Sequence, residues 1–202
     1  MATKGRVIRI RASGAAVAFV DEATTDTGDG LTYQITNPAK RVWSPTAAIT
    51  VEVDGAAAPA HTVNRLAGTI TFAADPLGVV TVSGSYLPMT TVARANAYSF
   101  SRKSVLAEDP EFGDIDVTRE VMQHTCSGSL RRWWVDDAFL DVLEAGLPIV
   151  IERADDNGAT PRWRAWALLT ERAHEVAAGG FQAEPITWEG TPDVDDRSCA
   201  FL

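Results

Sequence analysis

Two residues in the second half of the chain, His124 and Cys126, are of types that can do chemistry together. In a β-strand they would lie on the same face, so an imidazole could deprotonate a nearby thiol. Nucleophilic sites of this kind also need a third group that orients the base, and the sequence around the pair offers none. We therefore expect these residues to belong to an ordinary strand face, without a catalytic role.

A second candidate is an acidic segment that spans residues 107–116 and contains one proline and one glycine. Calcium loops alternate their oxygen ligands and end in a glutamate, and this segment does neither. Clustered charges around turn residues are typical of an exposed loop. Its carboxylates are Glu108, Asp109, Glu111, Asp114 and Asp116.

The usual signatures of enzymes are missing from the sequence. It has no glycine-rich phosphate loop, no Gly-x-Ser-x-Gly turn and no histidine or cysteine pairs at zinc spacing. No run of apolar residues is long enough to cross a membrane as a helix. The expectation is a non-enzymatic protein without cofactor, metal or membrane contact, made in a cytosol.

Charge is divided unevenly along the chain. Residues 1–90 carry seven basic and seven acidic groups, whereas residues 91–202 carry eleven basic and twenty acidic ones. A surface with excess negative charge repels a polyanion, so specific binding of nucleic acid is disfavoured. The two cysteines lie far apart in the sequence and imply no disulfide framework.

The first half predicts short strands. Residues 49–53 alternate between apolar and polar types and end in Asp54-Gly55, a pair that favours positive φ angles. Residues 61–66 and 69–72 flank Ala67-Gly68 as a tight hairpin, and a further strand follows from residue 79 to residue 87. We expect a β-meander over residues 46–87, preceded by a polar loop over residues 21–30.

The second half predicts longer strands and one helix. Strands are expected at 98–106 and 117–126, followed by a break at Ser127-Gly128-Ser129 and a strand at 130–135. Residues 147–154, 163–176 and 181–188 predict a three-stranded antiparallel meander. Between these groups, Asp136 or Asp137 can cap a helix over residues 136–145, which Gly146 ends. Its apolar face, expected to pack on the sheet, is Phe139, Leu140 and Leu143.

Four consecutive residues combine the side-chain types that protein interfaces favour: Arg131, Arg132, Trp133 and Trp134. Neighbouring residues of a strand point to opposite faces, so one indole can enter the core while the other faces a partner. Burial of both rings within one subunit is the alternative.

The second half resembles the major tail tube protein of bacteriophages with long, non-contractile tails. Four features carry this resemblance: the acidic loop Glu108 to Asp114 with Phe112-Gly113-Asp114, the segment Cys126 to Leu130, the helix 136–145, and the hairpins that end in Ile186-Thr187-Trp188-Glu189-Gly190. It covers about half of the chain, and the order of elements carries more weight than any single residue.

The resemblance implies a mainly β subunit, a β-sandwich or barrel-like tail tube fold with one flanking helix. Six copies would close into a ring, and rings would stack into a tube through which DNA passes without specific binding. The acidic loop, with Glu108 to Asp116 and Phe112, would contact the next ring. Implied partners are the chain itself, a tape measure protein, a tail terminator and a distal tail protein. The implied location is the virion tail, assembled in the bacterial cytoplasm.

This interpretation divides the chain into an added N-terminal meander region (1–90), the tube domain (91–190) and an acidic C-terminal arm (191–202). Two alternatives stay open. One is another particle component, such as a tail terminator, a distal tail protein or a capsid decoration protein. The other is a carbohydrate-binding β-sandwich that uses its tryptophans for stacking. Electron microscopy of the purified protein would distinguish a self-assembling protein from a monomeric binding module.

Overall fold

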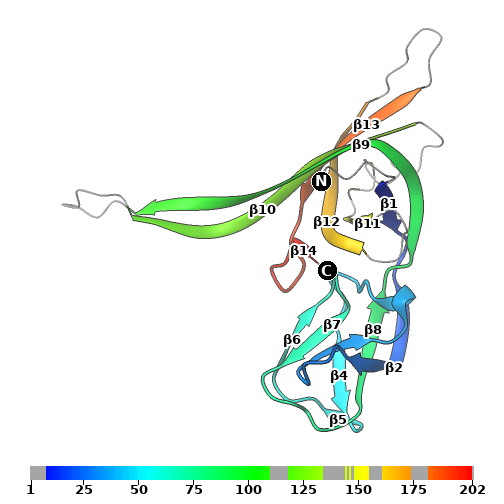
Figure 1. Cartoon of the computed structure of the whole chain (residues 1–202), viewed down its shortest axis with the longest axis vertical. Coiled ribbons are helices and arrows are strands. Elements are labelled where there is room, and N and C mark those ends of the chain that lie inside the picture. Colours follow the sequence, from blue (N-terminus) through cyan, green and yellow to red (C-terminus); the bar gives the residue numbers. More distant parts are fainter. Residues whose placement is uncertain are drawn as a thin grey trace, which may run out of the picture.

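The computed structural model is mainly β, which confirms the expected fold class. It describes residues 8–109, 118–133, 144, 146, 148–154, 161–173 and 182–201. The strands form two sheets of seven strands each (Figure 1). The described part contains one 3-10 turn, Pro38–Lys40.

The first sheet is barrel-like. Its order is β11-β1-β9-β10-β13-β12-β14, and β11 also pairs with β12, so the strand pairings run in a closed circuit. All of these pairings are antiparallel. The strands are β1 (Ile8–Ser13), β9 (Met89–Asp109), β10 (Thr118–Trp133), β11 (Ile149–Ala154), β12 (Pro161–Arg172), β13 (Ala183–Gly190) and β14 (Cys199–Phe201).

The second sheet folds over itself as a small sandwich. Its order is β5-β4-β8-β2-β3-β7-β6. The first part of β2 pairs with β8, its last part pairs with β3, and the register shifts near Asp21, whose φ is 48°. One strand therefore serves both layers. The strands are β2 (Val17–Asp26), β3 (Thr32–Ile35), β4 (Thr50–Val53), β5 (Ala56–Ala57), β6 (His61–Asn64), β7 (Thr69–Phe72) and β8 (Val80–Tyr86).

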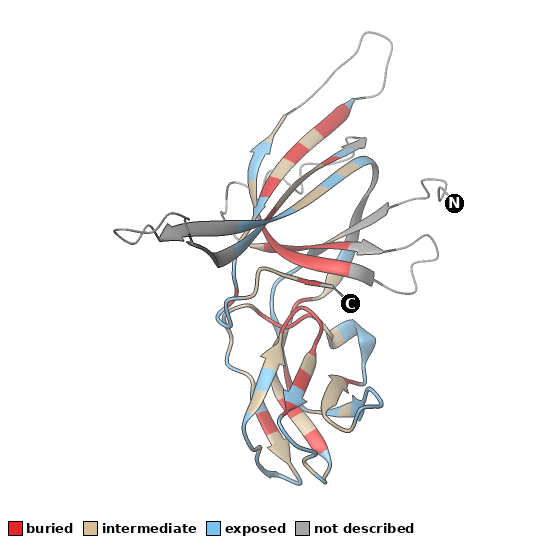
Figure 2. Cartoon of the chain, turned by 60° about the vertical axis from the view of Figure 1, so that its left-hand side comes forward, coloured by how far each residue is buried: buried red, intermediate tan, exposed pale blue. Residues whose placement is uncertain are grey.

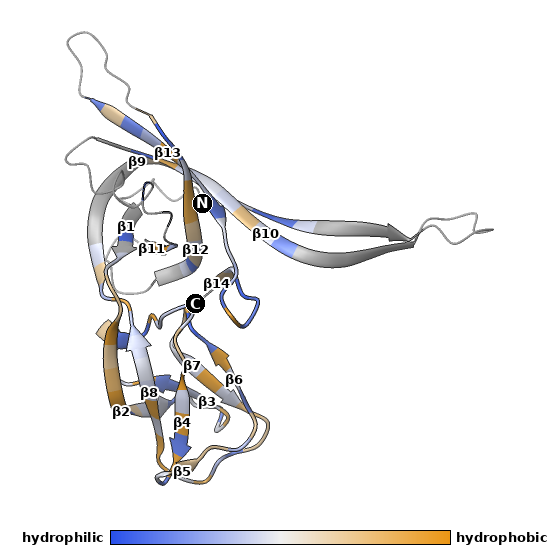
Figure 3. Ribbon diagram, turned by 180° about the vertical axis from the view of Figure 1, so that it is seen from behind, coloured by the Kyte–Doolittle hydropathy of each residue, from blue (hydrophilic) through white to orange (hydrophobic). Residues whose placement is uncertain are grey.

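Each sheet encloses its own apolar core. Trp163 and Trp188 stack inside the barrel-like sheet at a centroid distance of 6.2 Å, and Phe100 stacks on Trp163 at 4.4 Å. Trp43 and Phe19 lie at the centre of the sandwich. Figure 2 shows buried residues along both groups of strands, and Figure 3 shows hydrophobic stretches on β2, β7 and β12.

The sandwich is inserted between β1 and β9. Residues 8–13 pair with β9 on one side and with β11 on the other, so they belong to the barrel-like sheet. The N-terminal region predicted over residues 1–90 therefore does not form one unit, because β1 belongs to the barrel-like sheet although the whole sandwich separates it in sequence from β9. Period-2 alternation reveals a strand but not its distant partners.

Several local expectations are confirmed, whereas others are wrong. Asp54 and Gly55 have φ angles of 51° and 77° and join β4 to β5, as their types predict. The hairpin around Gly68 is also present. The simple meander over 46–87 is wrong, since β8 pairs with β4 and β2. Residues 21–26, expected in a loop, continue β2.

The sequence predicted a break in the strand at Gly128. This expectation is wrong, because β10 runs continuously through this residue. A Cβ atom at this position would lie 2.3 Å from the Ser99 carbonyl oxygen and 2.6 Å from a ring carbon of Trp188. Glycine is therefore required here by the close approach of Trp188 and the neighbouring strand.

We expect Gly128→Ala to lower the free energy of unfolding by about 1–3 kcal/mol, because the added methyl group must displace backbone or an indole. Urea denaturation followed by circular dichroism measures this change. Gly14→Ala is the matched control, since its Cβ would meet Pro88 at an ordinary 3.6 Å. Equal stability of the two variants would contradict the steric explanation.

The C-terminal residues do not form a separate arm within this chain. Gly190, the last residue of β13, pairs with Ala167 of β12. Cys199, the first residue of β14, pairs with Ala165, which lies two residues further along the same strand. Residues 191–198 thus form a loop between β13 and β14, and both of these strands pair with β12. The sequence predicted an acidic arm over residues 191–202, but Asp193 and Asp195 make contacts within this chain that are described below.

The expected helix over residues 136–145 lies outside the described residues, apart from Glu144. The same holds for its proposed core face, Phe139, Leu140 and Leu143.

Candidate assembly ribbon and the junction between the sheets

The most prominent feature of the surface is a two-stranded ribbon that projects from the barrel-like sheet (Figure 1). β9 and β10 pair with each other from Ala95↔Arg132 to Asp109↔Thr118. β13 accompanies β10 only as far as Ser127. Residues 102–109 and 118–126 therefore continue as a pair with no third strand among the described residues. Eight residues at the strand rise of about 3.3 Å extend roughly 25 Å.

This assembly ribbon, residues 102–109 with 118–126, exposes polar side chains near its base. Lys103, Ser104, His124 and Thr125 are exposed, and the Ser104 hydroxyl lies 3.1 Å from Nδ1 of His124. An isolated hairpin of two strands is marginally stable in water, and no described strand pairs with either outer edge of this one. Such a ribbon is suited to gain stability from contact with another chain.

The sequence-predicted loop residues map to the tip of this ribbon only in part. Glu108 and Asp109 are the last residues of β9. Glu111, Phe112, Asp114 and Asp116 lie outside the described residues. The expectation that these carboxylates contact another ring stays a prediction.

The predicted interface segment begins in β10. Arg131 is exposed at the end of the strand, and Arg132 and Trp133 pair with Glu184 and Ala183 of β13. Trp134 lies outside the described residues. The assignment of this segment to a subunit interface stays a prediction.

His124 and Cys126 contact different partners. His124 is exposed beside Ser104, whereas Cys126 is buried and its sulfur lies 3.9 Å from the Ser198 carbonyl oxygen. Cys199 packs against the same core cluster as Cys126. The two residues thus do not form a thiol–imidazole pair in the described contacts.

The two sheets meet across a buried charged cluster that the sequence analysis missed. Arg164 Nε donates to Glu152 Oε2 at 2.8 Å, and Arg164 Nη1 donates to the Leu66 carbonyl oxygen of the sandwich. Arg11 Nη1 lies 3.3 Å from Glu152 Oε1. Arg164 is 6% exposed and Glu152 1%, and burial lowers the pKa of Arg164 while Glu152 opposes that shift.

Alternation along β12 explains how one strand serves both the core and this junction. Trp163, Ala165 and Ala167 belong to the core of the barrel-like sheet. Arg164 and Trp166 point to the opposite face, where Trp166 packs with Val42 and Leu66 of the sandwich region. Because both faces are covered, residues 163–167 are all buried. The run Trp-Arg-Ala-Trp-Ala was the one available sequence signal of a strand covered on both faces.

The 191–198 loop completes the junction. Asp193 Oδ1 accepts from the backbone N–H groups of Asp195 and Arg197, and its Oδ2 accepts from Trp166 Nε1 at 3.3 Å. Asp195 pairs with Arg65 at 2.9 Å, and Arg65 also donates to the Ser44 carbonyl. The loop therefore fastens the sandwich to the barrel-like sheet.

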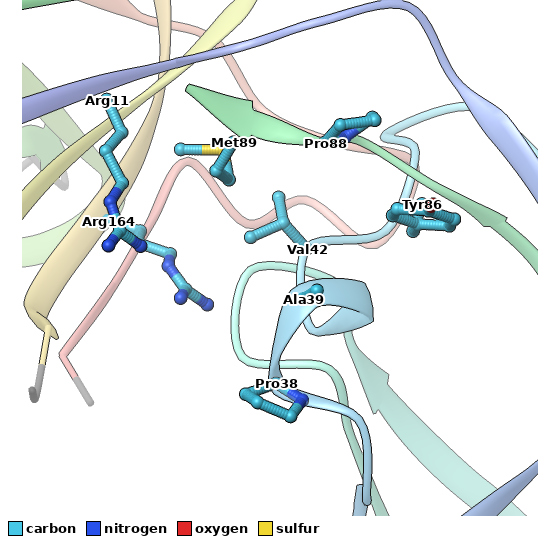
Figure 4. A pocket seen from close by; sticks show the side chains of 8 residues that line it. All are labelled: Arg11, Pro38, Ala39, Val42, Tyr86, Pro88, Met89 and Arg164. Atoms are coloured by element: carbon cyan, nitrogen blue, oxygen red, sulfur yellow. The ribbon is translucent and has the colours of Figure 1, made fainter. Parts of the chain in front are cut away.

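A cleft of about 410 Å³ opens beside the junction. Arg11 and Arg164 lie at one end of it, and the sandwich region and the start of β9 supply its less polar walls (Figure 4). The wall residues are Pro38, Ala39, Val42, Tyr86, Pro88 and Met89. Arg164 is already engaged by Glu152 and Leu66, so its charge mainly holds the sheets together.

The described tryptophan side chains offer no stacking platform for a sugar. Trp43, Trp163, Trp166 and Trp188 are at most 3% exposed. The carbohydrate-binding alternative therefore gains no support from these four residues.

Comparison with known proteins gives no assignment. No protein-family model matches the chain, and a search of curated proteins finds no match. Within the described ranges, no group of three or more metal-binding side chains is found, and no helix is long and apolar enough to span a membrane.

Proposed function

We propose that this protein is a structural subunit of a phage-type tail tube, which assembles with copies of itself into stacked rings. The sequence resemblance suggests this class, and the barrel-like sheet with its flanking sandwich is compatible with it. In this proposal the sandwich is an addition to the tube domain, DNA passes through the ring without specific binding, and there is no catalytic reaction.

The assembly ribbon is the observation that carries the proposal. Residues 102–109 and 118–126 extend beyond every other described strand of their sheet, and no third described strand pairs with them. A second copy placed against the ribbon would cover its edges, which removes the hazard of uncontrolled pairing. The excess acid of residues 91–202 is compatible with a conduit that does not adhere to DNA.

Electron microscopy of the purified protein, combined with light scattering over a range of concentrations, tests the proposal. The wild-type chain should form tubes of uniform width. Single rings without stacking would instead favour a terminator or distal tail role. A protein that stays monomeric at every concentration would contradict self-assembly.

A variant with a shortened ribbon tests directly whether the ribbon is needed for assembly. Lys103 and Thr125 are paired, so replacing residues 104–124 by Asn-Gly should close a short hairpin with the same register. We expect circular dichroism to show an intact β-fold but microscopy to show no tubes. Leu77→Ser, a change in an exposed loop of the sandwich, is the control and should assemble normally. Normal tubes from the shortened variant would show that the ribbon is dispensable.

A further inference from the structure

Cys126 and Cys199 lie together although they are distant in the sequence. Cys126 is 3% exposed in the core of the barrel-like sheet, and Cys199 is partly buried against that core. The Cys126 sulfur also lies 3.9 Å from the carbonyl oxygen of Ser198, the residue before Cys199. The two thiols thus occupy one small site between β10 and β14.

Gly190 makes room for this arrangement. A Cβ atom at Gly190 would lie 2.2 Å from the Cys126 sulfur, so any larger residue would push that side chain out of its place. β13 ends at Gly190, and β14 takes its position on the edge of β12 from Cys199 onward. The Cys126 side chain lies beside Gly190, at this change of strand, and hydrogen-bonds to the Cys199 side chain.

We propose that Cys126 and Cys199 form a redox-sensitive modification site, at which a small disulfide oxidant joins them in an intramolecular disulfide bond. The bond would tie β14 to β10 and so anchor the far end of the 191–198 loop. Since that loop carries Asp193 and Asp195, oxidation would also reinforce the junction between the two sheets.

The two thiols differ in pKa, and thiol–disulfide exchange needs one thiol that is readily deprotonated. The hydrogen bond from Cys126 lowers the pKa of Cys199 to about 6, and the same hydrogen bond raises the pKa of Cys126, with burial adding to the effect. Cys199 is therefore the attacking thiolate at neutral pH and Cys126 the resolving thiol.

The reaction balances in two steps. The Cys199 thiolate attacks one sulfur of oxidised glutathione, and a glutathione thiolate leaves. Cys199 then carries no negative charge, so Cys126 loses the interaction that held its proton. Its thiolate attacks the Cys199 sulfur and releases the second glutathione, while the proton goes to solvent. Two protein thiols are oxidised and one glutathione disulfide is reduced to two thiols.

Intact mass spectrometry and peptide mapping of the native chain test the site. After incubation with oxidised glutathione we expect the loss of two hydrogen atoms and a peptide that links residues 126 and 199, reversed by dithiothreitol. The oxidised protein should also show a Tm raised by several degrees, because the bond restricts the unfolded chain. The Cys126→Ala variant should stop at the glutathione adduct on Cys199, and Cys199→Ala should stay unmodified.

The pH dependence of alkylation provides an independent readout. The rate at which iodoacetamide modifies Cys199 in the reduced wild-type chain should rise with a midpoint near pH 6. In Cys126→Ala the midpoint should move upward, because the stabilising thiol donor is gone. Two free thiols after prolonged oxidation, or a persistent glutathione adduct on the wild-type chain, would overturn the proposal. Neither result depends on whether the protein forms tubes.

Discussion

Arg164→Ala is expected to lower the free energy of unfolding by about 3–5 kcal/mol, because it leaves a buried carboxylate without its main partner. Glu152 is 1% exposed, and Arg11 at 3.3 Å would be its one remaining ion-pair partner among the described residues. The substitution also removes the hydrogen bond to the Leu66 carbonyl, so the barrel-like sheet and the sandwich lose a direct contact.

Urea denaturation measures this effect, and two further variants identify its cause. Lys103→Ala removes an exposed cation and should change stability by no more than about 0.5 kcal/mol. The double variant Arg164→Met with Glu152→Gln removes both charges and should recover part of the loss, since the uncompensated buried charge is gone. If the double variant is no more stable than Arg164→Ala, the loss does not come from the unpaired carboxylate.

Trp166→Ala is expected to cost about 3–5 kcal/mol, as large-to-small changes of buried aromatic residues do. Its side chain is fully buried and packs with Val42, Leu66, Leu87, Val150 and Ala200. The cavity would lie between the two sheets, so the sandwich and the barrel-like sheet should unfold less cooperatively. Urea titrations followed by fluorescence and by circular dichroism should then give separate transitions.

Trp166→Phe is the matched control for this prediction. It keeps most of the apolar volume but loses the donor to Asp193, so a smaller loss of about 1 kcal/mol is expected. Comparable losses in the two variants would mean that the hydrogen bond, and not the packing, couples the sheets. Coincident transitions in Trp166→Ala would show that other contacts suffice for cooperative unfolding.

Local features were predicted well from the sequence. The Asp54-Gly55 turn, the hairpin at Gly68 and the antiparallel order of β11, β12 and β13 follow from residue types within a few positions of one another. Turn preferences and period-2 alternation depend on neighbouring residues only, which is why a mainly β fold could be stated in advance.

The break expected at Ser127-Gly128-Ser129 was wrong because a local signal has more than one cause. Glycine occurs at turns, but it also occurs where another group approaches the backbone closely. At Gly128 the approaching groups are Ser99 and Trp188, which are 29 and 60 residues away in the sequence. The residues that neighbour Gly128 in the sequence therefore give no sign of this close approach.

The mainly β class of fold, the uneven distribution of charge and the turns at Asp54-Gly55 and Gly68 follow from the amino-acid sequence alone. Which strands are neighbours depends on the tertiary structure, and with it the closed circuit of pairings, the projecting ribbon and the junction between the sheets. Arg164 with Glu152 and Cys126 with Cys199 illustrate the difference. The sequence around each of these residues does not indicate a role. The ion pair and the contact between the two thiols form only because the pairing of distant strands places the partners side by side.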